Sequence, residues 1–216
     1  MLDGGPREGA VAALRRFAQT GTAEEHCDFC AVALFPVHRH LLEVAKRQII
    51  CVCDPCALRF QKAAGGRFRL IPRDPLALPD FQITDAEWEG WSLPINLAFF
   101  FQRSLSGKTV AMYPSPAGAM ESLLPLANWS ALAEKNPALA SMEADVEALL
   151  VNRVASAREY FIAPIDRCYE LVGLIRAHWR GLSGGEEVWG QITRFFANIR
   201  EAATGLESKP QEAQRA

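Results

Sequence analysis

The segments Cys27-Asp-Phe-Cys30 and Cys51-Val-Cys-Asp-Pro-Cys56 hold five of the six cysteines of the chain, with twenty residues between them. Two thiolates three residues apart at a tight turn can reach the same ion, and two such pairs supply the four sulfur ligands of a tetrahedral metal. A chain of this length builds a core without disulfide bonds, so the clustering favours metal binding. The spacing predicts a metal centre with Cys27, Cys30, Cys53 and Cys56 as ligands.

The identity of the metal is left open by this ligand set. Zinc is the first expectation, because it prefers four sulfur or nitrogen ligands in a closed tetrahedral site. Iron bound by four thiolates has the same geometry, and an iron-sulfur cluster also uses four cysteines, so both are alternatives. Without a metal, the same residues would be reduced thiols in a small core.

Three further side chains near the centre are candidate ligands. Cys51 lies two residues before Cys53 in an expected strand and therefore points to the same face, so it either replaces Cys53 as a ligand or packs beside the metal. His38 and His40 alternate onto one face of the preceding strand. Either could be an extra ligand or contact a ligand, but exposed strand residues are the commoner role for such histidines.

The segment around the cysteines is expected to form a small zinc-ribbon-like module over residues 24–73. Strands are predicted over 38–44 and 48–53, on either side of Ala45-Lys-Arg47, and a third strand over 67–71 follows a Gly-Gly turn. Residues 1–23 contain a short amphipathic helix at 7–19.

The remainder of the chain is predicted to be a mixed α+β domain over residues 74–204, with a helical C-terminal part and a mobile tail at 205–216. Two prolines within 74–79 mark the boundary. Strands are expected at 96–103, 109–113 and 160–163, and short helices within 118–136. A short helix is expected at 84–91, opened by a capping box at Thr84, and three further helices are expected at 143–157, 166–179 and 183–199, with Asp166 as a cap and Ser183 opening a capping box.

Composition places the chain among soluble globular proteins. Of its 216 residues, 50% are hydrophobic and 22% charged, and no apolar run approaches the roughly 20 residues that a membrane helix needs. The N-terminus lacks the basic and then apolar pattern of an export signal, so the cytoplasm is the expected compartment. Residues 1–73 carry a net charge of +4 and residues 74–216 carry −6, which describes a basic module on an acidic body.

Two loops carry residues that suit catalysis or ligand binding. Ser115 lies between two prolines in an exposed turn, and His178 and Arg180 precede a glycine-rich helix start that suits an anion. An enzyme would need these three side chains in one pocket. Neither loop matches a nucleophile elbow or a phosphate loop, so a structural turn is favoured for each.

The basic residues of the module suggest two kinds of partner. Arg59, Lys62, Arg67 and Arg69 surround a glycine turn, and Phe60 and Phe68 beside them could stack on nucleic-acid bases. If the module binds a protein instead, these aromatic rings are expected to close its core. We expect burial, because both rings flank the turn and the acidic body would repel a polyanion.

Several segments resemble an uncharacterised bacterial domain-of-unknown-function family (DUF5947-like) that is associated with gene clusters for nickel-iron hydrogenases. The segments lie at 27–30, 38–42, 51–58, 113–118, 149–153 and 168–185. The resemblance covers roughly residues 24–200 and adds Tyr113 and Arg153 to the candidate binding residues. It implies an accessory or electron-transfer role beside a hydrogenase. This implication rests on the gene neighbourhood and not on the chemistry of any residue.

A non-enzymatic function is the favoured interpretation of these features. No paired carboxylates, activated nucleophile or cofactor fingerprint stands out, whereas a basic metal module beside an acidic body suits electrostatic docking. The sequence predicts a metal-binding accessory or assembly protein that acts on a protein partner, with nickel-iron hydrogenase subunits as the partner that the resemblance implies. The alternatives are a rubredoxin-like or iron-sulfur electron carrier and a zinc ribbon that binds nucleic acid.

Overall fold

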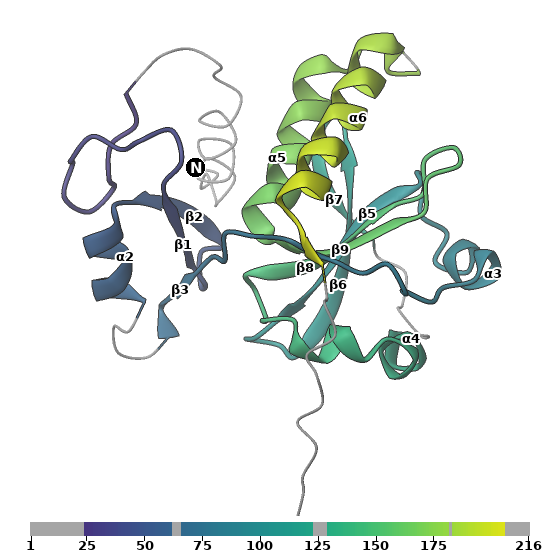
Figure 1. Ribbon diagram of the computed structural model, residues 1–216, viewed down its shortest axis with the longest axis horizontal. Helices are drawn as coiled ribbons and strands as arrows, with labels where there is room; N and C mark the ends of the chain where they lie inside the picture. The colour runs from purple at the N-terminus through teal and green to yellow at the C-terminus, as the bar shows by residue number, and fades with distance from the viewer. Residues whose placement is uncertain (1–23, 62–65, 123–128, 182, 206–216) are drawn as a thin grey trace, which may run out of the picture.

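The computed structural model describes residues 24–61, 66–122, 129–181 and 183–205 (Figure 1). The helix predicted at 7–19 and nearly all of the predicted tail lie outside these residues. The described part contains two sheets, and the chain passes from one to the other between Leu70 and Leu76. None of the described helices has the length and apolar character that crossing a membrane requires.

The first sheet has three antiparallel strands in the order β2-β1-β3. They are β1 (Arg39–Glu43), β2 (Gln48–Val52) and β3 (Phe68–Leu70), so the predicted hairpin and third strand are present. The turn between β1 and β2 requires a left-handed backbone at Arg47 (φ 54°). Its register pairs Leu41 with Ile50 and His40 with Cys51.

A helix that the sequence analysis did not predict follows β2 directly. Helix α2 (Asp54–Phe60) begins with Cys53 as its N-cap residue and has Pro55 and Asp54 in its first turn. Proline suits this position because N–H groups in the first turn of a helix have no intrahelical acceptor, so the absence of an N–H costs no hydrogen bond. An acid there interacts favourably with the helix dipole. The module therefore consists of a knuckle, which is the tight turn from Cys27 to Ala31, followed by the hairpin β1–β2 and helix α2.

The second sheet has seven strands in the order β10-β4-β9-β8-β5-β6-β7. Only the pair β10–β4 is parallel among the described strands. The strands are β4 (Leu76–Ala77), β5 (Leu97–Arg103), β6 (Lys108–Ser115), β7 (Gly118–Glu121), β8 (Glu147–Asn152), β9 (Glu159–Pro164) and β10 (Thr204–Gly205).

Helices cover both faces of this sheet (Figure 1). On one face α5 (Ile165–His178) and α6 (Gly185–Ala202) lie side by side and bury an apolar cluster that includes Phe99, Leu150 and Phe196. The other face packs against α3 (Asp85–Glu89), α4 (Trp129–Lys135) and the 3-10 helix Pro137–Ser141. The described residues thus form a mixed α+β fold, as the sequence predicts.

The predicted helix at 143–157 is wrong, because this segment contains strand β8. Its residues Ala148 to Val151 are each 0% exposed, with alternate side chains in the apolar clusters on the two faces of the sheet. A strand buried on both faces reads as a continuous apolar run, and such a run also fits a helical stripe. The short helices predicted within 118–136 are also partly wrong, because Gly118–Glu121 is strand β7 and only α4 is helical.

One predicted helix cap is confirmed and two are wrong. Thr84 and Glu87 form the predicted capping box of α3. The box predicted at Ser183 is absent, because α6 begins after Gly184, whose φ of 88° is left-handed. Asp166 is not the N-cap of α5, which is Pro164, but lies in the first turn.

We expect Gly184→Ala to lower the free energy of unfolding by about 1–3 kcal/mol. A Cβ atom there would lie 2.8 Å from Val188 Cγ1, and the backbone is left-handed. Gly190→Ala, within α6, is the matched control. Gly190 is exposed, and a Cβ atom added there would meet no neighbouring atom within 4 Å. That change should stabilise by up to about 1 kcal/mol. Urea denaturation of both variants checks the prediction, and equal effects would contradict it.

Candidate metal centre

The four predicted ligands converge in the structure. The Sγ atoms of Cys27, Cys30, Cys53 and Cys56 all lie within 4.8 Å of one another, and Cys30 and Cys53 are 3.6 Å apart. Four sulfurs at about 2.3 Å from one ion lie about 3.8 Å from each other when the site is tetrahedral. The cluster therefore fits a single tetrahedral ion with small movements of the side chains.

Local backbone structure positions each pair of cysteines. In the first pair, the N–H of Ala31 donates to the carbonyl of Cys27, and Ala31 has a left-handed backbone (φ 60°) that closes the knuckle. In the second pair, Cys53 caps α2 and Cys56 lies in its first turn. Asp28 joins the two, because its N–H donates to the carbonyl of Cys51 and its carboxylate accepts from the Cys51 N–H.

The electrostatics of the cluster suit a cation. Burial raises the pKa of the Cys27 thiol, but hydrogen bonds to the backbone of Cys53, Cys30 and Phe29 outweigh burial and lower this pKa to about 6. Burial and the neighbouring thiols raise the pKa of Cys56 to about 12. Four sulfurs this close cannot all carry negative charge unaided, and a divalent cation would supply the compensating charge.

Aromatic side chains form the small core beneath the cysteines. Phe29 stacks on Phe60 with ring centroids 4.0 Å apart, and its edge meets Phe68 at 5.4 Å. Phe68 is buried and Phe60 is half-buried. The rings considered as stacking partners for nucleic-acid bases are thus packed together inside the module.

The basic residues near these rings are partly neutralised by neighbours. Arg67 and Lys46 both pair with the buried Glu43, at 2.9 and 3.1 Å. Arg69 donates to the carbonyl of Ala144 in the acidic body. Two of the predicted phosphate-binding residues, Arg67 and Arg69, therefore have contacts within the chain.

Cys51 belongs to a second group of potential ligands and not to the four-thiol cluster. Its Sγ atom and one ring nitrogen each of His38 and His40 lie within 4.8 Å of one another. The expectation that Cys51 and Cys53 share a face assumed a continuous strand, but β2 ends at Val52 and the chain turns into α2. Counting back from the turn Ala45–Arg47 would have paired His40 with Cys51 and revealed this group.

His40 is also tied to the second sheet. Its Nδ1 atom lies 2.7 Å from Asp166 Oδ2 at the start of α5. Burial would lower the pKa of His40, but the hydrogen bonds to Asp166 and Cys51 outweigh burial and raise it to about 9. Asp166 was expected to cap α5, but it lies in the first turn of the helix, and from there its carboxylate reaches His40.

The candidates in the Ser115 turn take part in local structure. The Ser115 hydroxyl donates to the carbonyl of Gly118 and accepts from the N–H of Ala117, so it closes the β6–β7 turn. Tyr113 is half-buried on β6 opposite Met120. These contacts describe a turn and supply no base for a nucleophile.

The other candidates also have partners within the chain. His178 pairs with Glu187 at 2.8 Å, and Arg180 donates to the carbonyls of Ala177 and Trp179. Arg153 is buried, where it donates to the Tyr160 hydroxyl and pairs with Asp85. Arg153 thus satisfies buried polar groups beside the sheet.

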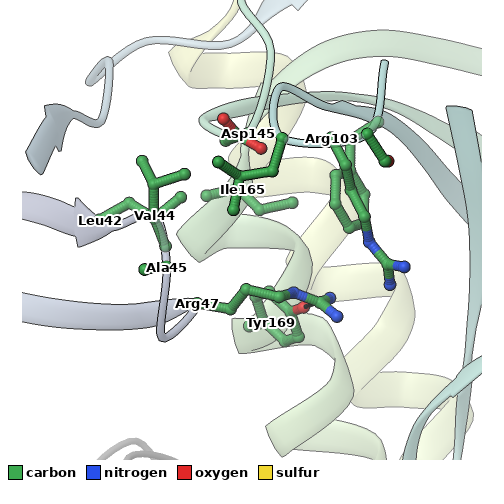
Figure 2. A pocket seen from close by; sticks show the side chains of 11 residues that line it. Leu42, Val44, Ala45, Arg47, Arg103, Asp145, Ile165 and Tyr169 are labelled. Carbon is green, nitrogen blue, oxygen red and sulfur yellow. Dashed lines mark hydrogen bonds between the residues drawn. The ribbon is translucent and has the colours of Figure 1, made fainter. Parts of the chain in front are cut away.

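A separate cavity of about 190 Å³ lies where the hairpin meets the second sheet (Figure 2). Leu42, Val44 and Ala45 line it from the hairpin, and Arg103 faces them from β5. Arg47 donates to the hydroxyl of Tyr169 at one side of the cavity. None of the cysteines and none of the five other candidate residues lines this cavity.

Comparison with known proteins gives one match. A family model described as a family of unknown function (DUF5947) matches residues 26–203. No curated protein and no solved structure matches the chain. The match begins just before the first cysteine pair and ends after α6, so it includes the four-thiol cluster and most of both sheets.

Proposed function

The chain belongs to the family of unknown function DUF5947, and from the geometry of its cysteines we propose that it is a zinc-binding accessory or assembly protein that docks on a protein partner. The observation that carries the proposal is the convergence of four Sγ atoms within 4.8 Å. Four protein ligands leave no open position on a tetrahedral ion, which is typical of structural and not catalytic zinc.

The zinc would organise the module more as a zinc finger does than as a ribbon. One ligand pair lies in a knuckle and the other at the start of α2, with the hairpin between them. The metal would therefore join the knuckle loop, the hairpin and the helix, which the small core alone holds weakly. Reduced thiolate ligands also fit a reducing compartment such as the cytoplasm.

A docking surface is suggested by the loop that follows the knuckle. Three apolar residues in this loop are strongly exposed: Val32 at 50%, Phe35 at 82% and Val37 at 77%. Clustered exposed apolar residues commonly mark protein interaction sites, and aromatic residues are enriched at interface cores. Because the loop leaves the exposed ligand Cys30 directly, the metal would hold this surface in shape.

The partner class follows from where the aromatic rings lie. Phe60 and Phe68 pack within the module, which favours a protein partner over nucleic acid. A nickel-iron hydrogenase subunit is the partner that the sequence resemblance suggests. Iron in the same four-thiol site would instead support the electron-carrier alternative.

Elemental analysis after chelator-free purification tests the metal. We expect the four-thiol site to hold about one equivalent of zinc, which Cys30→Ser and Cys56→Ser lose. Cys168→Ala is the matched control, because Cys168 is buried in the second sheet's core and far along the chain from the cluster. Less than half an equivalent of any metal would contradict the proposal, and iron in place of zinc would convert it to the electron carrier.

Affinity purification from a native extract tests the docking loop. We expect Phe35→Ser to lose a stoichiometric protein partner and to keep its zinc, because the side chain is 82% exposed and lies outside the ligand set. Leu105→Ser is the control, since Leu105 is 77% exposed on a different turn. Recovery of nucleic acid without a protein at about 150 mM salt would contradict the proposed partner class.

A further inference from the structure

The group His38, His40 and Cys51 lies on the hairpin beside the four-thiol centre. His40 and Cys51 are direct cross-strand partners, and His38 precedes His40 by two residues on the same side. The rings of the two histidines meet edge to face with centroids 4.7 Å apart. One nitrogen from each ring and the Cys51 Sγ atom lie within 4.8 Å of one another.

His38 is arranged as a metal ligand would be. Its Nδ1 atom is 2.9 Å from the carbonyl of Phe35, so Nδ1 carries the proton and Nε2 presents a lone pair. The Nε2 atom is buried and has no hydrogen-bond partner within the described part of the chain. An unsatisfied buried nitrogen is costly, and a bound ion would satisfy it.

His40 has the support that ligating histidines usually have. Metal-binding imidazoles almost always donate their second N–H to a carboxylate or a carbonyl, which orients the ring and makes the other nitrogen a better ligand. Asp166 Oδ2 lies 2.7 Å from His40 Nδ1, and both side chains are less than a fifth exposed. A metal would replace the present hydrogen bond between His40 and Cys51.

We propose that His38, His40 and Cys51 bind a second metal ion through two imidazole nitrogens and one thiolate. The mixed nitrogen and sulfur set suits a borderline-soft ion, of which zinc is the first choice. Three protein ligands leave one coordination position for water or for a small exogenous ligand such as a thiolate or another anion. This site goes beyond the proposed function, which needs only the four-thiol centre.

The two centres differ in character although they share a hairpin. The four-thiol set is closed, whereas a site with three protein ligands and one open position is the arrangement of catalytic and ligand-binding zinc. The backbone of Cys51 holds the knuckle through Asp28, and its side chain serves the second site. Because Asp166 belongs to α5, the second site also connects the module to the body of the protein.

Metal content and cobalt spectra of the full chain test this proposal. At micromolar free zinc we expect two equivalents in the wild type and one in Cys51→Ala and His38→Ala. Cys30→Ser should lose both equivalents, because the hairpin that carries the second site loses its order without the four-thiol ion. Cys51→Ala and His38→Ala keep that ion, so failure of the second site alone is distinguishable from failure of the four-thiol site. His178→Ala is the matched histidine control and should keep two, because His178 pairs with Glu187 at a distant helix end.

Cobalt(II) distinguishes the two ligand sets, because thiolate-to-cobalt charge transfer grows with the number of thiolates. We expect Cys51→Ala to remove only the weaker charge-transfer component, and an added small thiol to shift the visible bands of that component alone. Retention of the four-thiol spectrum would show that the variant is folded.

Asp166→Asn tests the supporting carboxylate. It should weaken metal binding at the second site by about 10–100-fold and leave the four-thiol site unchanged. Glu170→Gln is its control, because Glu170 lies one turn further along α5 and pairs with Arg167. A wild type that binds one equivalent at micromolar free zinc, with no change in His38→Ala, would overturn the proposal. So would ready alkylation of Cys51 in the zinc-saturated protein.

Discussion

The variants Cys30→Ser and Cys56→Ser should lose the ordered structure of β1–β3 and α2 while the seven-stranded sheet remains folded. Structural zinc contributes apparent free energies of about 10–16 kcal/mol in small zinc modules at pH 7. Among the described residues, the apolar core of this module has six buried members, which include Leu41, Val52 and the candidate ligand Cys27, and it cannot replace that contribution. Hydrogen exchange at the amides of β1 and β2 measures the effect, with an expected loss of protection of at least about 100-fold.

The four-thiol variants need a control for general instability. Cys168→Ala removes a buried sulfur from the larger core and should lower its stability without releasing β1 or β2. The amides of β5 and β8 should keep their protection in Cys30→Ser. If β1 and β2 stay protected in both four-thiol variants, the metal does not stabilise the module.

Val151→Asp is expected to destabilise the protein by about 4 kcal/mol or more, or to prevent its folding. Val151 is 0% exposed on the central strand β8, in the cluster with Phe100 and Trp91. A carboxylate there would be buried without a partner, which is among the most destabilising of substitutions. In the helix that the sequence predicted, Val151 would lie on the solvent side and the change would cost little.

Met120→Asp is the matched control for Val151→Asp. Met120 is 42% exposed on β7, the edge strand of the same sheet among the described strands, where a carboxylate stays hydrated. We expect a change of less than about 1 kcal/mol in the free energy of unfolding for this variant. Urea denaturation followed by tryptophan fluorescence measures both, and similar effects for the two variants would contradict the assignment of β8 as a central strand.

The four-thiol cluster and its hairpin were predictable because their determinants are local. Cys-x2-Cys spacing brings two sulfurs together through one turn, and the Ala45–Arg47 turn sets the register of β1 and β2. Helix α2 was missed although Asp54-Pro55 was a signal for a helix start. The capping box at Thr84 was correct because it needs only residues 84–87.

The sequence by itself determined the four-thiol cluster, the hairpin and the mixed α+β class, because each depends on local patterns: the spacing within each cysteine pair, the turn at Ala45–Arg47, and the apolar periodicity of single elements. Only the tertiary structure decided that 147–152 is a strand, since its continuous apolar run fits both a strand buried on two faces and the apolar stripe of a helix. It also decided that Asp166 contacts His40. His40 and Asp166 are 126 residues apart, and their contact exists because α5 packs against the hairpin. No local sequence pattern encodes a contact between residues so far apart, so the carboxylate that supports the proposed second site becomes visible only once the two sheets are assembled.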